Sequence, residues 1–516
     1  MNAAVALSSP ERFYDQSRQA FEDIVRSLSS EEARSMTHSE LERDLEKKGR
    51  ELMRKLLQEH LQTRGPGQCA QPVRDADGVE RTRVRLQERK LESIFGTVAT
   101  ERAGYGKEGR RSLQPLDAEL NLPDERYSLE LRRRVAEEAA KSSFDETLES
   151  IGKTTGAHVP KRQIEELVMR AAVDFDAFYQ MRQGQPAEIE QTSPILVISV
   201  DGKGVVMRTQ DLREQTRKAA IKRKHKMGAR LSKGEKNNAK RMATVAAVYT
   251  IAPFVRKPED LICENARAGP YRPRPERKRV WASLEKTPEE VIEKTFEEAG
   301  NRDPEHLKMW VALVDGNKPQ IRILRRMAKK KGIDLTIIVD VIHVIEYLWD
   351  AGRVFYQSGP ELEDWVRVRL VEVLRGNAGY VAGGMRRSAT LRSLTPAVRE
   401  PVDTCANYLL TYGSYLKYND YLAKGFPIAT GVIEGACRHL VKDRMQVTGA
   451  RWSLTGAEAV LRLRALRSSH DFDDYWTFHE YKEYDRNHRA LYAEGIVPPT
   501  VKPNTPRKPG HLKAVK

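Results

Sequence analysis

The chain of 516 residues is long enough for about three domains of roughly 150 residues each. Its 89 Lys and Arg exceed its 73 Asp and Glu by 16, so a nucleic acid is the first partner to consider, although composition alone also allows an anionic membrane surface. Four isolated cysteines exclude a disulfide framework, and the lack of a long apolar run or a basic leader excludes a transmembrane helix and a signal peptide. We therefore expect a cytoplasmic protein without membrane contact.

Residues 1–66 are predicted to form a helical N-terminal segment, because leucines recur at helical spacing between Leu41 and Leu57. Its mixed-sign polar face is typical of a bundle or dimerising helix rather than of direct DNA contact. Residues 67–120 follow a Gly-Pro-Gly break and are predicted to be a small β-rich region without zinc ligands.

Residues 121–183 are predicted to be helical, with a short turn between their second and third helices. The third helix opens with Lys161, Arg162 and Gln163, which fits a helix-turn-helix whose second helix contacts DNA. The alternative is an ordinary helical hairpin.

Apolar strands and helices alternate across residues 190–340, which predicts the core of an α/β domain with a buried sheet. Residues 341–428 then show only helical patterns, an all-helical insertion, and residues 429–470 form a closing helical region. Residues 471–516 are predicted to be a C-terminal tail. From about residue 485 the tail is rich in Pro and Lys, with little to bury, and we expect its end to be disordered. The strands are expected at 195–202, 243–251, 306–316 and 334–340.

The motif Val-Asp-Gly occurs twice, and each copy places a carboxylate after an apolar strand: Asp201 and Asp315. Open α/β sheets bind ligands at the carboxyl ends of their strands, where two neighbouring carboxylates repel unless a cation lies between them. Hard oxygen ligands of this kind are typical of Mg²⁺ sites. The alternative is that Asp-Gly is a common turn after a strand.

A third carboxylate would have to come from a helix at the same edge, and Glu434 is the best candidate. Its alternative role is a surface ion pair with Arg438, four residues later. Asp340 ends the fourth expected strand, so it competes with Asp315 as the second metal ligand or else caps the following helix. His343 lies on an apolar helical face, where a core histidine is a better explanation than a zinc ligand.

The segment from residue 213 to residue 241 contains twelve Lys or Arg and two Glu, which indicates a solvated loop or an arm that contacts phosphates. A second basic loop is expected at 269–279. Trp452 beside Arg451 could stack on an unpaired base, or could be a core residue. The predicted DNA contacts of the basic arm are Lys222, Arg223, Lys224, Lys226 and Arg230.

Four stretches of the chain resemble the DDE transposases of bacterial insertion sequences, most closely the ISKra-type family and more distantly Mutator-like transposases. They are VISVDGKGV, ALVDGNKP, VDVIHVIEYLWDAG and, most specifically, GVIEGACRHLVKDRMQVTGARWSLTGAEAVLRLRAL. The likeness covers roughly residues 190–470. It implies an RNase H-like catalytic domain interrupted by the helical insertion and preceded by a mainly helical DNA-binding region. Family members often carry cysteine pairs before the LQPLD segment, and this chain has none, which argues against a zinc module.

Matched position by position, the resemblance implies that Asp201, Asp315 and Glu434 are the catalytic, metal-binding triad. It assigns Asp340 and His343 to an Asp-x-x-His element outside that triad, so it favours Asp315 over Asp340.

The resemblance further implies that two Mg²⁺ ions, for which Mn²⁺ is expected to substitute, support cutting and strand transfer. Arg438 and Lys442 would lie near the scissile phosphate. The partners would be double-stranded DNA, as terminal inverted repeats and target, and further copies of the chain in a dimer or larger assembly at the bacterial nucleoid. The alternatives are an RNase H-like nuclease without strand transfer and a transposase-derived DNA-binding regulator.

Overall fold

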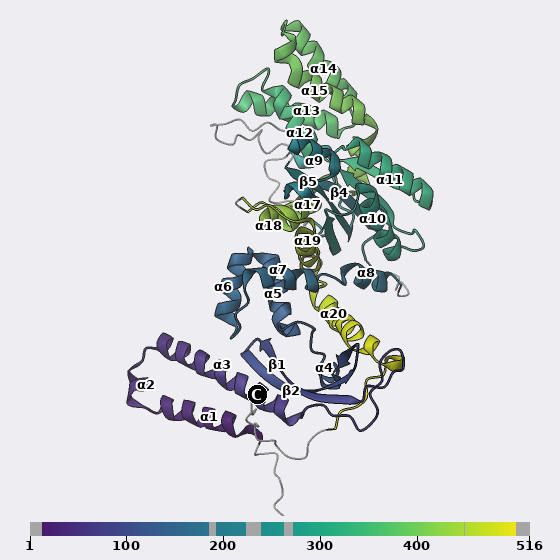
Figure 1. The fold of residues 1–516 in the computed structure, drawn as a ribbon. Coiled ribbons are helices and arrows are strands. Elements are labelled where there is room, and N and C mark those ends of the chain that lie inside the picture. Colours follow the sequence, from purple (N-terminus) through teal and green to yellow (C-terminus); the bar gives the residue numbers. More distant parts are fainter. Residues whose placement is uncertain (1–12, 185–191, 223–238, 263–271, 448, 502–516) are drawn as a thin grey trace, which may run out of the picture. The chain divides into compact units, whose positions relative to one another are not determined.

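The computed structural model describes residues 13–184, 192–222, 239–262, 272–447 and 449–501. The chain folds as two compact units, one made of the residues up to Phe178 together with those from Asp473 onward, the other of Tyr179–Phe472 (Figure 1). Throughout the described part of the chain, every helix is too short or too polar to cross a lipid bilayer.

The first unit begins with a helical hairpin that packs on a small antiparallel sheet. The side-chain amide of Gln58 donates to the carbonyl of Ala99 at 2.6 Å and accepts from its N–H at 2.7 Å, which attaches the second long helix to the middle strand. The elements are α1 (Asp15–Leu28), α2 (Glu31–Ser35), α3 (His38–Thr63), β1 (Arg83–Ser93), β2 (Gly96–Lys107), β3 (Arg110–Leu113) and α4 (Pro115–Glu119).

Three helices follow, α5 (Leu129–Lys141), α6 (Phe144–Thr154) and α7 (Lys161–Ala171), and α5 packs on both of the others. They are followed by α8 (Phe175–Gln183). Capping boxes help to set where helices begin: Ser143 and Glu146 exchange hydrogen bonds at the start of α6.

The described part of the C-terminal tail is ordered within the first unit, an arrangement that its composition did not indicate. After α20 (Phe472–Asn487), Tyr492 is buried in a small core with Val73 and Tyr105, and the N–H of Val501 donates to the carbonyl of Gln68 at 2.7 Å. The expected disorder therefore does not begin near residue 485, and the final residues, 502–516, lie outside the described part.

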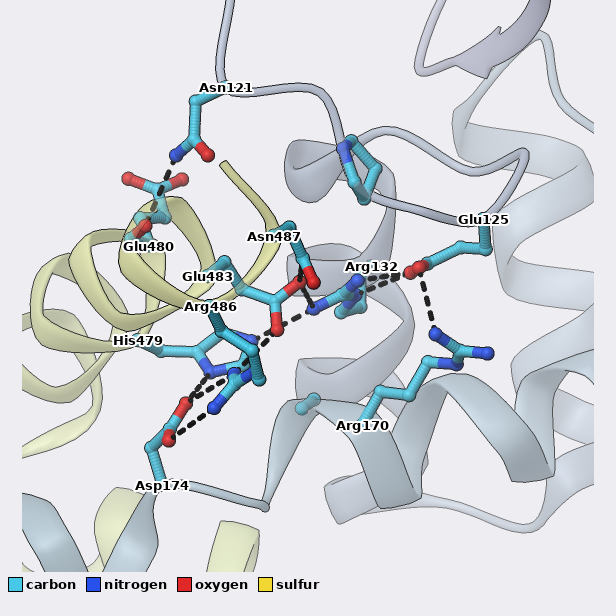
Figure 2. A network of polar contacts seen from close by, with 12 residues as sticks. Asn121, Glu125, Arg132, Arg170, Asp174, His479, Glu480, Glu483, Arg486 and Asn487 are labelled. Carbon is cyan, nitrogen blue, oxygen red and sulfur yellow. Dashed lines mark hydrogen bonds and ion pairs between the residues drawn. The ribbon is translucent and has the colours of Figure 1, made fainter. Parts of the chain in front are cut away.

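A buried polar network joins α5, the end of α7 and α20 (Figure 2). Arg132 is fully buried, with one guanidinium nitrogen 2.9 Å from Glu483 and another 2.9 Å from Glu125. Asp174 accepts from His479 at 2.8 Å and from Arg486 at 3.1 Å. The charges of the first unit are therefore matched across segments that lie more than 300 residues apart in the sequence.

This network predicts loss of stability in acid. Burial alone would raise the pKa of Asp174, but hydrogen bonds from His479 and Arg486 lower it to about 2. Because the folded value lies below the unfolded one, the contribution, roughly 2 kcal/mol, is complete above about pH 5 and is lost as the pH falls toward 2. We expect Asp174→Asn to lower the melting temperature of the protein at pH 6 much more than at pH 3.

The matched control is Asp473→Asn, because Asp473 pairs with Arg133 at 2.6 Å with 84% of its side chain exposed. An equal effect of both variants at pH 6, or an effect of Asp174→Asn that does not shrink in acid, would contradict the prediction.

The second unit is built on a five-stranded sheet of order β6-β5-β4-β7-β8. β5 runs antiparallel to both of its neighbours, whereas β4, β7 and β8 are parallel. The predicted α/β architecture with a buried sheet is present. The strands are β4 (Ile195–Val206), β5 (Lys240–Ile251), β6 (Glu276–Ser283), β7 (Met309–Val314) and β8 (Leu335–Val339).

Two predictions about the sheet require correction, one about the length of a strand and one about a loop. β4 continues past residue 202 to Val206, because its far half keeps pairing with β5 after its pairing with β7 has ended. The expected basic loop at 269–279 is wrong from Glu276 onward, where β6 begins. Its first residues are charged and lie on the edge of the sheet, so an apolar pattern appears only from Val280.

Helices cover the sheet and extend beyond it (Figure 1). α10 packs on β4 and β5, α17 packs on the same strands, and α19 packs on β6. A helical block, α12–α16, connects β8 to α17, and α14 and α15 run side by side within it. The helices of this unit are α9 (Glu214–Ile221), α10 (Pro288–Arg302), α11 (Lys318–Lys331), α12 (Val341–Gly352), α13 (Pro360–Leu374), α14 (Ala378–Leu391), α15 (Pro396–Tyr412), α16 (Tyr418–Ala423), α17 (Gly431–Ala436), the π-helix η7 (Cys437–Lys442), α18 (Asp443–Met445) and α19 (Leu454–Ser468).

Candidate functional site

Asp201 and Asp315 lie beside each other where β4 and β7 separate. The last paired residues of these parallel strands are Ser199 and Leu313, so each aspartate follows two positions later in the same register. Both side chains are half-buried. Oδ1 of Asp201 accepts from the N–H of Gly202 at 2.6 Å, and Oδ1 of Asp315 accepts from the N–H of Asn317 at 2.9 Å, which orients both carboxylates.

The electrostatics of Asp315 show that the two carboxylates interact. Burial raises the pKa of Asp315, and the negative charge of Asp201 raises it further, while the N–H of Asn317 opposes both effects. A carboxylate whose ionised form is destabilised by a neighbouring carboxylate has a reason to bind a cation between the two.

Asp340 follows β8 and lies beside the end of β7, since its N–H donates to the carbonyl of Val314 at 2.9 Å. Its carboxylate is fully buried, and both oxygens are engaged: Oδ1 caps α12 by accepting from the N–H of Ile342 at 2.9 Å, and Oδ2 accepts from the hydroxyl of Thr430. Of the two roles considered for Asp340, the structure shows the helix cap.

Glu434 lies on α17, the helix that packs on β4 and β5, and its side chain is exposed. Thr430 connects it to the strand ends, because the hydroxyl that donates to Asp340 also lies 3.3 Å from Oε1 of Glu434. The alternative surface pair with Arg438 is absent from the described residues, and Arg438 lies instead 3.6 Å from Asp443.

The turn that follows Glu434 touches Asp201 directly. Here the helix widens into the π-helix η7, and the Cys437 thiol lies 3.1 Å from Oδ2 of Asp201. Burial raises the pKa of this thiol, and the charges of Asp201 and Glu434 raise it further, so it stays neutral and donates. A π-helical turn inside an α-helix is frequently found at a functional site. Cys437 therefore links the helix of Glu434 to the strand of Asp201.

His343 is not the buried core histidine that was expected. Its side chain is 34% exposed, and Nδ1 lies 3.0 Å from Glu346. Burial by itself lowers its pKa, but Glu346, Asp340 and Asp315 together raise the value above that of a free imidazole.

Tyrosines of the helical block hold the peptide carbonyls at the strand ends, a feature that the sequence did not indicate. The hydroxyl of Tyr412 donates to the carbonyl of Gly316, and that of Tyr418 donates to the carbonyl of Val339 at 2.7 Å. Gly316 has a φ of +94°, and a Cβ there would lie 3.2 Å from the hydroxyl of Tyr408, so the turn after Asp315 requires glycine.

We expect Tyr412→Phe to lower the free energy of unfolding by about 1–3 kcal/mol, because it leaves the buried carbonyl of Gly316 without its donor. The matched control is Tyr380→Phe on α14, since Tyr380 is 77% exposed. Chemical denaturation monitored by tryptophan fluorescence would measure both. Equal denaturation midpoints for the two variants would show that the hydrogen bond from Tyr412 to Gly316 does not stabilise the fold.

The donor set at the strand ends fits a hard cation better than a soft one. Asp201 and Asp315 present carboxylate oxygens, which suit Mg²⁺ or Mn²⁺, whereas Cys437 is a neutral thiol. Within the described ranges, no group of three or more His, Cys, Asp and Glu side chains already has the geometry of a metal site.

The predicted DNA contacts have different outcomes. Lys222, Lys442 and Arg451 are exposed, as a phosphate contact requires. Lys161 lies 2.7 Å from Asp145, while Arg162 and Gln163 both lie within hydrogen-bond distance of Glu166, so these three already have protein partners. The remaining residues of the basic arm lie outside the described part of the chain: Arg223, Lys224, Lys226 and Arg230.

Of the two roles considered for Trp452, base stacking is contradicted and the core residue is confirmed. Only 6% of the residue is exposed, its indole N–H donates to the carbonyl of Met445 at 3.1 Å, and the guanidinium of Arg444 covers its ring. Its backbone bonds with Val206 and Arg208 attach it to the end of β4. Trp452 is therefore a core residue.

The chain has little detectable similarity to known proteins. No family model and no curated protein matches the chain. Among solved structures, the chain shares a likeness with the "Drosophila P element transposase strand transfer complex", at 8% identity over 71% of this chain and 82% of that one, with a TM-score of 0.23. At this TM-score the two chains do not superpose closely.

Proposed function

We propose that the protein is a DNA transposase of an insertion sequence, which binds the terminal inverted repeats and uses Asp201, Asp315 and Glu434 to cut and join DNA. One observation carries the proposal: two carboxylates from separate, parallel strands meet at one sheet edge, and the helix that carries a third is bonded to the first through Cys437. If Asp201 and Asp315 only belonged to ordinary Asp-Gly turns, the contact between Cys437 and Asp201 would not be needed.

The topology of the second unit supports an RNase H-like catalytic domain. Counted within the sheet, the strand order is 3-2-1-4-5 with the second strand antiparallel, and the first and fourth strands carry Asp201 and Asp315. The helical block stands between the fifth strand and the helix of Glu434, which is where the resemblance to ISKra-type transposases places an insertion.

Asp201 and Asp315 would hold two Mg²⁺ ions, for which Mn²⁺ would substitute, and Glu434 would complete the ligand set. When bound, such ions activate a water nucleophile and stabilise the leaving 3′ oxygen of a phosphodiester. Cys437 fixes the orientation of Asp201, and the Tyr412 bond fixes the turn after Asp315. Glu434 is exposed, so its side chain can approach a bound metal without first breaking a buried contact.

The rest of the chain would supply DNA contacts. Exposed Lys222, Lys442 and Arg451 lie on the catalytic unit, where phosphates would neutralise them. The helices α6 and α7 would read the inverted repeats as a helix-turn-helix, although the present partners of Lys161, Arg162 and Gln163 would have to be exchanged for DNA. Pairing of two element ends would require a dimer or a larger assembly, acting at the bacterial nucleoid.

The test is to incubate purified protein with Mg²⁺ and a plasmid that carries its gene and flanking DNA, and to sequence nicks and new junctions. The proposal expects cuts at flanking inverted repeats and 3′ ends joined to new sites. Cuts without junctions would replace it by a metal-dependent nuclease. Specific binding without cleavage in either Mg²⁺ or Mn²⁺ would favour a DNA-binding regulator.

A further inference from the structure

A large cleft in the second unit lies on the other side of α17 from the carboxylates. Its volume is about 1240 Å³, and its walls come from β6 and the extended segment before it, from α17 and from the end of α19. Gly431, Gly435 and His439 line it at intervals of four residues, so they share one face of the helix, and Glu434 and Cys437 lie off that face.

The wall formed by β6 and the extended segment before it is lined with positively charged side chains. Arg274, Arg277 and Lys278 are exposed in succession along it. Among the described residues, Arg274 and Lys278 form no ion pair. Exposed His439 and His470 stand on the other walls.

The acidic residues of the cleft are already neutralised. Glu298 is bonded to Arg279 and lies 2.7 Å from Arg302. Burial alone would raise its pKa, but these two arginines lower it to about 2. Asp471 lies 2.5 Å from Arg182. Arg274 and Lys278 are therefore left for an anionic ligand.

The floor on α17 lets a ligand approach the backbone. A Cβ added at Gly431 or at Gly435 would meet no atom within 4 Å, so both glycines face open space. The volume is above the range of about 300–1,000 Å³ for small-molecule pockets, which suits a chain of a few linked units better than one small molecule or a whole turn of duplex.

We propose that this cleft binds the sugar–phosphate backbone of a single nucleic-acid strand, through Arg274 just before β6, Lys278 on β6 and the bare face of α17. A positive groove that follows the backbone is the general form of a single-strand site. The inference extends the proposed function, since a strand held here would lie against the helix that carries Glu434.

The test is a binding measurement that needs no catalysis. Fluorescence anisotropy in EDTA would compare the affinity of the full chain for a labelled single-stranded oligonucleotide with that of the variant Arg274→Ala/Lys278→Ala. We expect at least a tenfold weaker affinity for the variant. The slope of log affinity against log salt should fall by about 1.4, since each phosphate contact to a single strand contributes about 0.7. The matched control is Arg322→Ala/Lys329→Ala, which removes two exposed cations of α11 from the same unit.

Equal losses in both double variants, or no loss in either, would overturn the proposal, and so would a larger loss for duplex than for single strand. Its failure is separable from that of the proposed function. If the wild-type protein never cuts DNA but the cleft variant loses single-strand binding, the proposed transposase activity is wrong and the proposed binding site in the cleft stands. If the cleft variant cuts DNA normally and binds single strands normally, the proposed binding site is wrong and the transposase activity stands.

Discussion

Asp201→Asn, Asp315→Asn and Glu434→Gln are each expected to lower the rate of Mg²⁺-dependent DNA cleavage by about 10³-fold or more. A bound metal contributes several kcal/mol to stabilising the charge of the transition state, and each 1.4 kcal/mol is a factor of ten in rate. Each variant keeps the size of the side chain and removes one charge. Single-turnover cleavage of a labelled duplex that carries the element end would measure the rates, and binding of the same duplex in EDTA would show that DNA affinity is retained.

The informative control is Asp340→Asn. Asparagine can still accept from the N–H of Ile342 and cap α12, so we expect its rate to stay within about tenfold of the wild type. Full loss of cleavage in Asp340→Asn together with survival of cleavage in Asp315→Asn would reverse the assignment of the second ligand. If all four variants still cleave DNA at the wild-type rate, these carboxylates take no part in the reaction.

Arg132→Met is expected to destabilise the first unit by about 3 kcal/mol, because it removes the fully buried cation that Glu125 and Glu483 share and leaves them only the more exposed Arg170 and Arg486. Glu125 and Glu483 are only 11% and 8% exposed, so water cannot replace the guanidinium (Figure 2). A loss of this size is a large part of the stability of a typical domain. Urea unfolding monitored by circular dichroism should show an early transition in the variant.

Arg133→Met is the control one residue away. Arg133 pairs with Glu137 and with the exposed Asp473, and exposed pairs contribute at most about 1 kcal/mol. The account of the network would be wrong if both substitutions shifted the unfolding curve equally, or if Arg132→Met left it unchanged.

The carboxylates Asp201 and Asp315 could be predicted from sequence because the apolar runs before them are local signals. Each Val-Asp-Gly follows a run of buried residues, and parallel strands bring their carboxyl ends to one edge. The choice between Asp315 and Asp340 could not be made from the pattern, since both aspartates follow such a run. It depends on Thr430, which is 90 residues away in the sequence and engages Asp340.

Contacts that complete the site have no local signal. The Cys437 thiol contacts Asp201 from the first residue of the π-helix η7, and nothing in the residues of η7 marks the change from an α-helix. The bonds of Tyr412 and Tyr418 to the strand ends likewise join elements that only the tertiary fold brings together. A search for tyrosines at helical spacing in the insertion would have found them as a group, without showing what they hold.

The errors share one cause, which is that burial depends on the whole fold. Trp452 follows a polar turn, so base stacking stayed open for it, yet its backbone pairs with the end of β4. The charged start of β6 looks like a loop, yet it is the edge of a sheet. Tyr492 lies in a stretch near the C-terminus with few apolar residues, yet it fills a core whose other members come from the N-terminal third.

The most direct test of the account is to map where a divalent ion binds on the protein itself. Fe²⁺ in place of Mg²⁺, with ascorbate and peroxide, produces hydroxyl radicals that cut the backbone beside the bound ion, and mass spectrometry identifies the fragments. The account predicts cuts near residues 201, 315 and 434 together, suppressed by excess Mg²⁺ and lost in Asp201→Asn. Cuts near only one of these segments, or cuts that persist unchanged in Asp201→Asn, would contradict a shared metal site.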